Sequence, residues 1–381
     1  MTEAVIVDAV RTPIGRRNGA LSGVHPADLS ALVLQALAER NQLDPATVDD
    51  VLWGCVSQVG DQAMNIGRYG VLGAGWPESV PATTIDRQCG SSQQATAFAH
   101  AAVVAGHYDI VVAGGVESMS RVPMFSTVQG GHPEGAMVKA RYGDRLVPQG
   151  VGAEMIADKW GLTKERLDSI AVRSHERAAA AIDSGAFKEQ IVPVTTPDGT
   201  VVDTDEGVRR GTSLEALSTL KTPFKENGKV TAGNASQISD GASAVLIMSD
   251  TKARELGLRP MARIVSSVVV GADPVTMLTG PIPATRKILG KTGLGVSDIG
   301  AFEVNEAFAS VIGAWEDELG PDTDRVNPNG GAIALGHPLG CSGARVMTTL
   351  VHHMRDNGLR YGLQTICEGG GMANATILEL L

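Results

Sequence analysis

Cys89 is the residue in this chain whose surroundings best suit nucleophilic chemistry. It follows a short β-branched run and precedes a helix pattern over residues 93–105. Its thiol would therefore face the unpaired N–H groups at the start of a helix, whose partial positive charge favours the reactive thiolate. A thiol in such a place is more often a packing residue, so the interpretation depends on the rest of the sequence.

Three further segments carry polar residues where a strand pattern meets a loop or helix. His337 lies in a glycine-dense loop, residues 327–343, Asn305 follows a strand pattern, and Cys367 precedes three glycines. A thiol nucleophile, an imidazole base, a second acid/base and a polar orienting group are the parts that acyl transfer needs. The sequence therefore predicts one pocket assembled from four distant segments.

These segments resemble those of the thiolases. They read C-G-S-S from residue 89, N-E-A-F from 305, G-H-P-L-G-C-S-G from 336 and C-E-G-G-G from 367. Their order and spacing fit that family along essentially the whole chain. The resemblance implies an enzyme, an acetyl-CoA C-acyltransferase, that works without a cofactor because CoA is itself a substrate.

The resemblance also implies a role for each site residue. Cys89 would carry the acyl group as a thioester, and His337 would take its proton and help hold the thioester oxygen. Cys367 would protonate or deprotonate the acetyl carbon. Asn305 would position a water, although a helix N-cap is the ordinary role of Asn at such a junction. The N–H groups of Gly369 and Cys89 would form a second oxyanion hole.

The order of the elements indicates a duplicated α/β protein. Strand and helix patterns alternate and begin again near residue 262, which favours helix-covered sheets related by duplication. The resemblance implies the thiolase fold, two βαβαβαββ units in five layers plus an inserted loop domain. The expected units are 1–119 with 238–260, the loop domain 120–237, and 261–381.

The loop domain is expected to cover the active site and bind CoA and acyl-CoA thioesters. Family resemblance gives Ser236 and Arg209 as CoA contacts. Judged by the residues alone, Ser236 lies in a tight turn that leads back to the N-terminal unit. Arg209 belongs to a solvated basic face that also contains Arg210, Lys221, Lys225 and Lys229.

Composition excludes several other classes of protein. A net charge of −10 argues against nucleic acid or an acidic membrane as a partner, and the longest apolar runs are too short to span a bilayer. Four widely spaced cysteines favour neither a disulfide scaffold nor a zinc site. A strand pattern from residue 4 leaves no room for a signal peptide, so we expect a cytoplasmic protein. The resemblance implies a homodimer or homotetramer.

The sequence departs from the family pattern at three places. Ser92 replaces a usual glycine, and Gln93-Gln94 follow where apolar or basic residues are more usual. Glu368 stands where a small or apolar residue is common, and strand alternation predicts that it points away from the Cys367 side. Pro148-Gln149 stands where acetoacetyl-CoA-specific members carry His-Met. Losing that pair should open room beside the acyl chain.

We therefore expect thiolytic cleavage of 3-ketoacyl-CoA through an acyl-Cys89 intermediate, in fatty-acid or steroid side-chain β-oxidation. One alternative is biosynthetic condensation of two acetyl-CoA, and another is a non-catalytic acyl-CoA-binding protein. A ketoacyl-synthase type would carry a second His where Cys367 stands. A Cys/His hydrolase would release free acid without CoA.

Overall fold

One continuous mixed sheet runs through both halves of the protein. The computed structural model describes residues 2–381, and the strand order is β10-β11-β12-β9-β1-β8-β5-β3-β4, with β2 paired to β8. The N-terminal strands are β1 (Ala4–Arg11), β2 (Gly15–Arg16), β3 (Asp50–Gly54), β4 (Ala82–Ile85), β5 (Ile110–Ser118) and β8 (Ser239–Ser249). The C-terminal strands are β9 (Ala262–Gly271), β10 (Ala301–Val304), β11 (Tyr361–Glu368) and β12 (Met372–Leu380).

The two halves repeat one pairing scheme, as the sequence predicts. In the first half β8 pairs antiparallel with β5, and β5, β3 and β4 are parallel. In the second half β12 pairs antiparallel with β11, and β11 is parallel to β10. Within residues 2–381 the strands of the two halves are joined where β1 and β9 pair over two residues on each strand.

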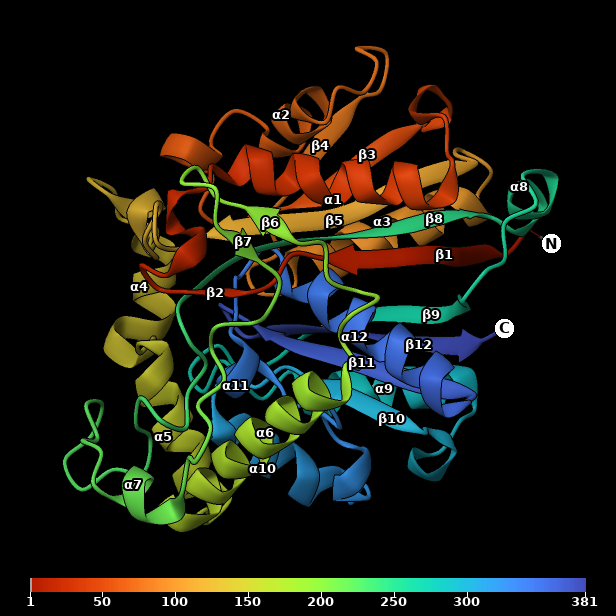
Figure 1. Ribbon diagram of the computed structural model, residues 1–381. Coiled ribbons are helices and arrows are strands. Elements are labelled where there is room, and N and C mark those ends of the chain that lie inside the picture. The colour runs from red at the N-terminus through yellow and green to blue at the C-terminus, as the bar shows by residue number, and fades with distance from the viewer. Residues whose placement is uncertain (1) are drawn as a thin grey trace.

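Helices complete five layers, which confirms the expected α/β fold (Figure 1). The outer layers are α1 (Pro26–Asn41) with α2 (Ile66–Gly73), and α9 (Pro281–Thr292) with α10 (Ala309–Leu319). The central layer is α3 (Ser91–Val104) with α12 (Ser342–Asn357). These two helices lie between the sheets, so the segments that begin them meet inside the molecule.

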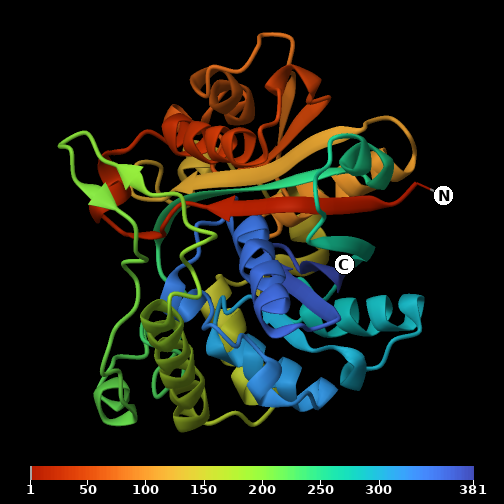
Figure 2. The same ribbon diagram turned by 45° about the vertical axis from the view of Figure 1, so that its right-hand side comes forward.

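The segment between β5 and β8 wraps one side of both halves (Figure 2). It contains α4 (Ala136–Tyr142), α5 (Gln149–Lys159), α6 (Lys164–Ser184), α7 (Leu214–Ser218) and the short pair β6 (Val194–Thr195) and β7 (Val201–Val202). The remaining helices are α8 (Asp250–Glu255) and α11 (Ala332–Leu335). Within residues 2–381, no helix is both long and apolar enough to cross a membrane.

One predicted boundary is wrong and bears on the site. A helix is expected from Asn305, but α10 begins at Ala309 with Phe308 as its N-cap. The Asn305 N–H instead donates to the carbonyl of Thr365 on β11 at 3.0 Å. Asn305 is therefore not a helix cap, and its side chain is left for the site.

Candidate active site

Cys89 lies in a tight turn between β4 and α3. The residue before it, Gln88, has a φ of 49°, a left-handed conformation that is uncommon for a side chain of this kind. Ser91 holds the turn together, because its hydroxyl donates to the Gln88 carbonyl at 2.6 Å and accepts from the Arg87 N–H at 2.9 Å. The Cys89 side chain is buried against the start of α3, as the sequence predicts.

The hydrogen bonds of His337 indicate which of its ring nitrogens carries the proton. The Ser342 hydroxyl donates to the Pro338 carbonyl at 2.8 Å and lies 2.6 Å from His337 Nδ1, so Nδ1 is assigned the proton. Nε2 then carries the lone pair, and the Asn305 Nδ2 group donates to it at 3.4 Å. This arrangement gives His337 the tautomer of a general base.

Burial sets the protonation of both groups. It lowers the pKa of His337 to about 3, and the positive charge of Arg345 acts in the same direction. Burial, together with the Glu368 charge, raises the pKa of the Cys89 thiol to about 12, although the backbone N–H groups of Cys89 and Gly369 act to lower it. The resting pair is therefore thiol and neutral imidazole, since burial outweighs the expected effect of the helix start.

The second cysteine lies beside the first. Cys367 is on β11, and burial raises its pKa well above the usual range, with the Cys89 charge as the next cause. A hydrogen bond from the Gly369 N–H lowers the pKa of the Cys89 thiol. The structure thus brings Cys89, Cys367 and Gly369 together, with Asn305 against His337.

The His337 loop is fixed against the nucleophile helix by buried polar groups that sequence reasoning missed. The Ala344 N–H at the start of α12 donates to Ser92 Oγ on α3 at 2.9 Å. Gln93 on the same helix reaches Thr376 Oγ1 at 3.0 Å. The signal was the departure from the family pattern at residues 92–94, where Ser92 contacts α12 and Gln93 contacts β12.

Glu306 fixes the other side of the loop. Its carboxylate accepts hydrogen bonds from Ser174 Oγ at 2.7 Å, Asn327 Nδ2 at 3.0 Å and the Ile333 N–H at 3.0 Å. Ser174 belongs to α6, and Ile333 lies in α11, which leads directly to His337. The N-E-A-F segment therefore supplies Asn305 to the site, and its Glu306 holds the loop that leads to His337 in place.

Ser236 lies next to this site, whereas Arg209 lies farther out. The Ser236 N–H donates to the Ala307 carbonyl at 3.0 Å. Exposed Arg209 follows the loop beside α6, where its N–H donates to His175 Nδ1 at 3.1 Å. Within the basic face, Arg210 pairs with Asp183, and Lys225 and Lys229 pair with Asp158.

A largely apolar hollow opens beside the C-E-G-G-G segment. It encloses about 800 Å³, and its wall includes Gly370, Gly371 and Met372. Further lining comes from the inserted segment and the end of β9, including Phe125, Val138, Pro148, Gly271 and Met277. Pro148, which belongs to the pair that stands where acetoacetyl-CoA-specific members carry His-Met, is part of this lining.

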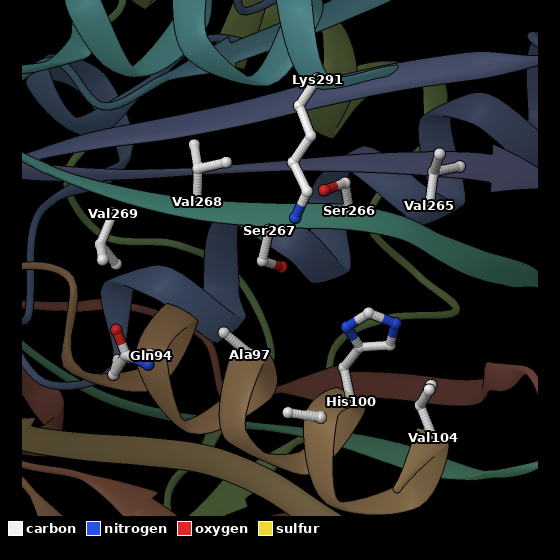
Figure 3. Close-up of a pocket in the computed structure, with 11 residues that line it drawn as sticks. Gln94, Ala97, His100, Val104, Val265, Ser266, Ser267, Val268, Val269 and Lys291 are labelled. Atoms are coloured by element: carbon white, nitrogen blue, oxygen red, sulfur yellow. The ribbon is translucent and has the colours of Figure 1, made fainter.

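A second hollow lies between α3 and β9, away from the catalytic segments. Figure 3 shows His100 projecting from α3 and Lys291 projecting from α9 toward it, with Ser267 between them. None of the residues predicted to take part in the reaction lines this hollow. We therefore assign the chemistry to the first region only.

Comparisons with known proteins agree with this geometry. The family model described as thiolase, N-terminal domain, matches residues 4–251, and thiolase, C-terminal domain, matches residues 258–380. The chain is 52% identical to the steroid 3-ketoacyl-CoA thiolase FadA6 of Mycobacterium tuberculosis, over all of this chain and 95% of that protein.

Two other similar proteins extend the comparison. A 3-ketoacyl-CoA thiolase of Escherichia coli O1:K1 / APEC is 46% identical over the whole of both chains. The crystal structure of the Bacillus anthracis acetyl-CoA acetyltransferase superposes with a TM-score of 0.92 at 40% identity, covering 100% of this chain and 99% of that one.

Proposed function

Because the chain belongs to the thiolase family and is an acyltransferase, we propose that it cleaves 3-ketoacyl-CoA with CoA. The products are acetyl-CoA, or another short acyl-CoA, and an acyl-CoA shortened accordingly. The observations that carry this proposal are a neutral His337 whose Nε2 faces Asn305 and, at the turn before α3, the neighbouring buried thiols of Cys89 and Cys367. Relatives named 3-ketoacyl-CoA thiolases support the degradative direction.

In the first half-reaction Cys89 attacks the β-carbonyl of the substrate. His337 Nε2 takes the thiol proton as the S–C bond forms, and the N–H groups of Cys89 and Gly369 stabilise the developing oxyanion. The bond between the α and β carbons then breaks. Its electron pair stays on the acetyl-CoA carbon, which takes a proton from Cys367. Acyl-Cys89, protonated His337 and the Cys367 thiolate remain.

In the second half-reaction CoA releases the acyl group. The Cys367 thiolate takes the proton of the CoA thiol, and the CoA sulfur attacks the acyl-Cys89 thioester. Cys89 leaves as a thiolate and recovers its proton from His337. Both groups return to the neutral state that burial favours, so each turnover ends where it began.

The apolar hollow supports a bulky acyl group as the preferred substrate. Its volume of about 800 Å³ lies within the range of roughly 300–1,000 Å³ found for small-molecule sites. A long chain or a ring-bearing side chain would place its apolar part there, as in fatty-acid or steroid side-chain β-oxidation. The name of the mycobacterial relative supports the steroid type.

The remaining expectations belong to the same proposal. Ser236 would contact the pantetheine arm, and Arg209 would face the nucleotide part of CoA. The protein would act in the cytoplasm, where reducing conditions keep Cys89 and Cys367 as free thiols. It would do so as a homodimer or homotetramer.

The test follows the 3-ketoacyl-CoA enolate absorbance and its CoA-dependent loss. Wild type and Cys89→Ala are compared on acetoacetyl-CoA and on a long-chain or ring-bearing 3-ketoacyl-CoA. Activity that Cys89→Ala abolishes, with the larger substrate preferred, supports the proposal. Preference for acetoacetyl-CoA would indicate the biosynthetic type. CoA binding without turnover of either substrate would indicate a binding protein.

A further inference from the structure

Glu368, the last residue of β11, faces the turn that carries Cys89. Its side chain is fully buried. A Cβ placed on Gly90 would lie 2.0 Å from Glu368 Oε1, so the carboxyl group rests directly on the backbone of the residue after Cys89. Strand alternation predicts that Glu368 points away from the site, and this is wrong: the side chain lies against the turn that carries Cys89, and its charge also raises the pKa of Cys367.

The carboxyl group has no hydrogen-bond partner in this position. Neither of its oxygens is paired within residues 2–381, and the nearby Arg87 Nε and Asn374 Oδ1 are also without partners there. Asn374 uses its Nδ2 group on the Gly90 carbonyl at 3.2 Å. A buried carboxylate without donors is costly, so the neutral acid is the favoured form.

The same helix start serves two acidic groups. Gly90 is the N-cap of α3, a helix of 14 residues that has no side-chain cap. The Gly90 and Ser91 N–H groups donate to the carbonyls of Arg87 and Gln88, so α3 acts on Cys89 and Glu368 through the positive end of its dipole, which favours a negative charge on either group. Two negative charges at one helix end repel each other, so ionising one group disfavours ionisation of the other.

We propose that Glu368 is a positioning residue that controls the reactivity of Cys89 through its proton. While Glu368 is neutral, the positive end of α3 acts on the Cys89 thiolate alone. Once Glu368 ionises, its charge opposes thiolate formation. This inference rests on Cys89 being the nucleophile of the proposed function. It adds to that function a loss of Cys89 reactivity at alkaline pH, where Glu368 is ionised.

The surrounding charges agree with this role. Burial raises the pKa of Glu368 to about 8, while Arg87 lowers it and Asp86 raises it. After burial, Glu368 is the largest cause that raises the pKa of Cys89. Glu117 from β5 adds a smaller effect on Cys89, and Cys367 on the same strand also feels Glu368. From β12, Asn374 and Met372 contribute no charge.

The experiment measures alkylation of Cys89 by iodoacetamide from pH 6 to 10, read by mass spectrometry of the Cys89 peptide. Glu368→Gln should match wild type near pH 6 and react roughly threefold to tenfold faster above pH 9. Glu368→Met has a similar length and no charge, and it should behave in the same way. Glu303→Gln is the matched control.

Glu303 is a good control because burial also raises its pKa to about 8, yet it is not among the groups that shift Cys89. Wild type provides a readout of its own. When the logarithm of its Cys89 alkylation rate is plotted against pH, the slope should fall below one above pH 8, where Glu368 ionises. A slope of one throughout in wild type, or variant profiles that coincide with it, would overturn the inference.

Alkylation needs no substrate, so the result does not depend on turnover. If alkylated Cys89 still supported turnover, the proposed function would fail instead. The two failures are therefore distinguishable in the same samples.

Discussion

The N–H of Gly340, in the loop that carries His337, donates a 2.8 Å hydrogen bond to the Glu117 carboxylate at the end of β5. The same fully buried carboxylate accepts from the N–H groups of Val56 and Ser57 and from Gln62 Nε2, at 2.8–3.0 Å. One side chain thus joins the N-terminal sheet to the catalytic loop of the other half.

Replacing Glu117 should therefore damage both stability and turnover. Glu117→Ala leaves four buried donors unpaired, and we expect a loss of at least about 3 kcal/mol in the free energy of unfolding. Glu117→Gln should cost less, because its carbonyl still accepts. Urea denaturation and kcat measure the two effects. Glu78→Ala removes an exposed carboxylate and serves as control; equal urea midpoints for it and Glu117→Ala would refute the expectation.

The low pKa of His337 predicts a stability that falls in acid. The group binds a proton near pH 6.5 when unfolded but only near pH 3 when folded. Between these values the unfolded state holds more protons, so stability rises with pH across this window and is lost as pH falls toward 3. His337→Gln should reduce the change in the free energy of unfolding across this pH window by roughly a few kcal/mol.

Urea denaturation at pH 4, 5, 6 and 7 checks this prediction on wild type and His337→Gln. The other buried histidines are present in both proteins, so the difference between the curves isolates His337. Parallel curves would mean that His337 titrates normally in the folded protein. The same pKa also predicts no loss of kcat near pH 6.5 from protonation of His337.

Much of the fold could be predicted because its signals are local. Strands such as β1 and β10 are short apolar runs, and the repeat of strand and helix patterns indicates a duplicated sheet. Cys89 and His337 each lie at a boundary between a strand pattern and a small-residue segment, which is visible in the sequence. Their resemblance to a family then suggested a common site.

Long-range packing explains what could not be predicted. The start of α10 is set by pairing of Asn305 with Thr365 on β11, a contact across 60 residues. Ser92 and Gln93 read as unusual polar residues until α12 is placed against Ser92 and β12 against the Gln93 side chain. Alternation along β11 predicted the wrong surroundings for Glu368, because only the tertiary structure shows that the turn carrying Cys89 packs against its side chain.

The close approach of the two central helices gives a test of packing. A Cβ on Gly343 of α12 would lie 2.1 Å from the backbone nitrogen of Gln93 on α3. Gly343→Ala should therefore force the helices apart and cost about 1–3 kcal/mol or more. Gly290→Ala is the control, because a Cβ at that position in α9 meets no atom within 4 Å.

Thermal unfolding of the two variants should shift in opposite directions. Gly290→Ala removes a flexible residue from a helix and should stabilise by about 0.5–1 kcal/mol. Gly343→Ala should also lower kcat, because α12 begins just after the His337 loop. A melting temperature for Gly343→Ala equal to that of wild type would contradict this account of the helix crossing.

The apolar hollow offers a substitution that changes substrate choice without disturbing the catalytic groups. Gly271 ends β9 and lines the hollow, and a Cβ there meets no atom within 4 Å. Gly271→Leu should fill part of the space reserved for a bulky acyl group. We expect kcat/KM for a long or ring-bearing 3-ketoacyl-CoA to fall by about tenfold or more, as the loss of roughly 1.4 kcal/mol of binding would give. Acetoacetyl-CoA, whose acyl group is too short to reach that space, should be cleaved at nearly the wild-type rate. An equal loss on both substrates would show that the hollow does not hold the acyl chain.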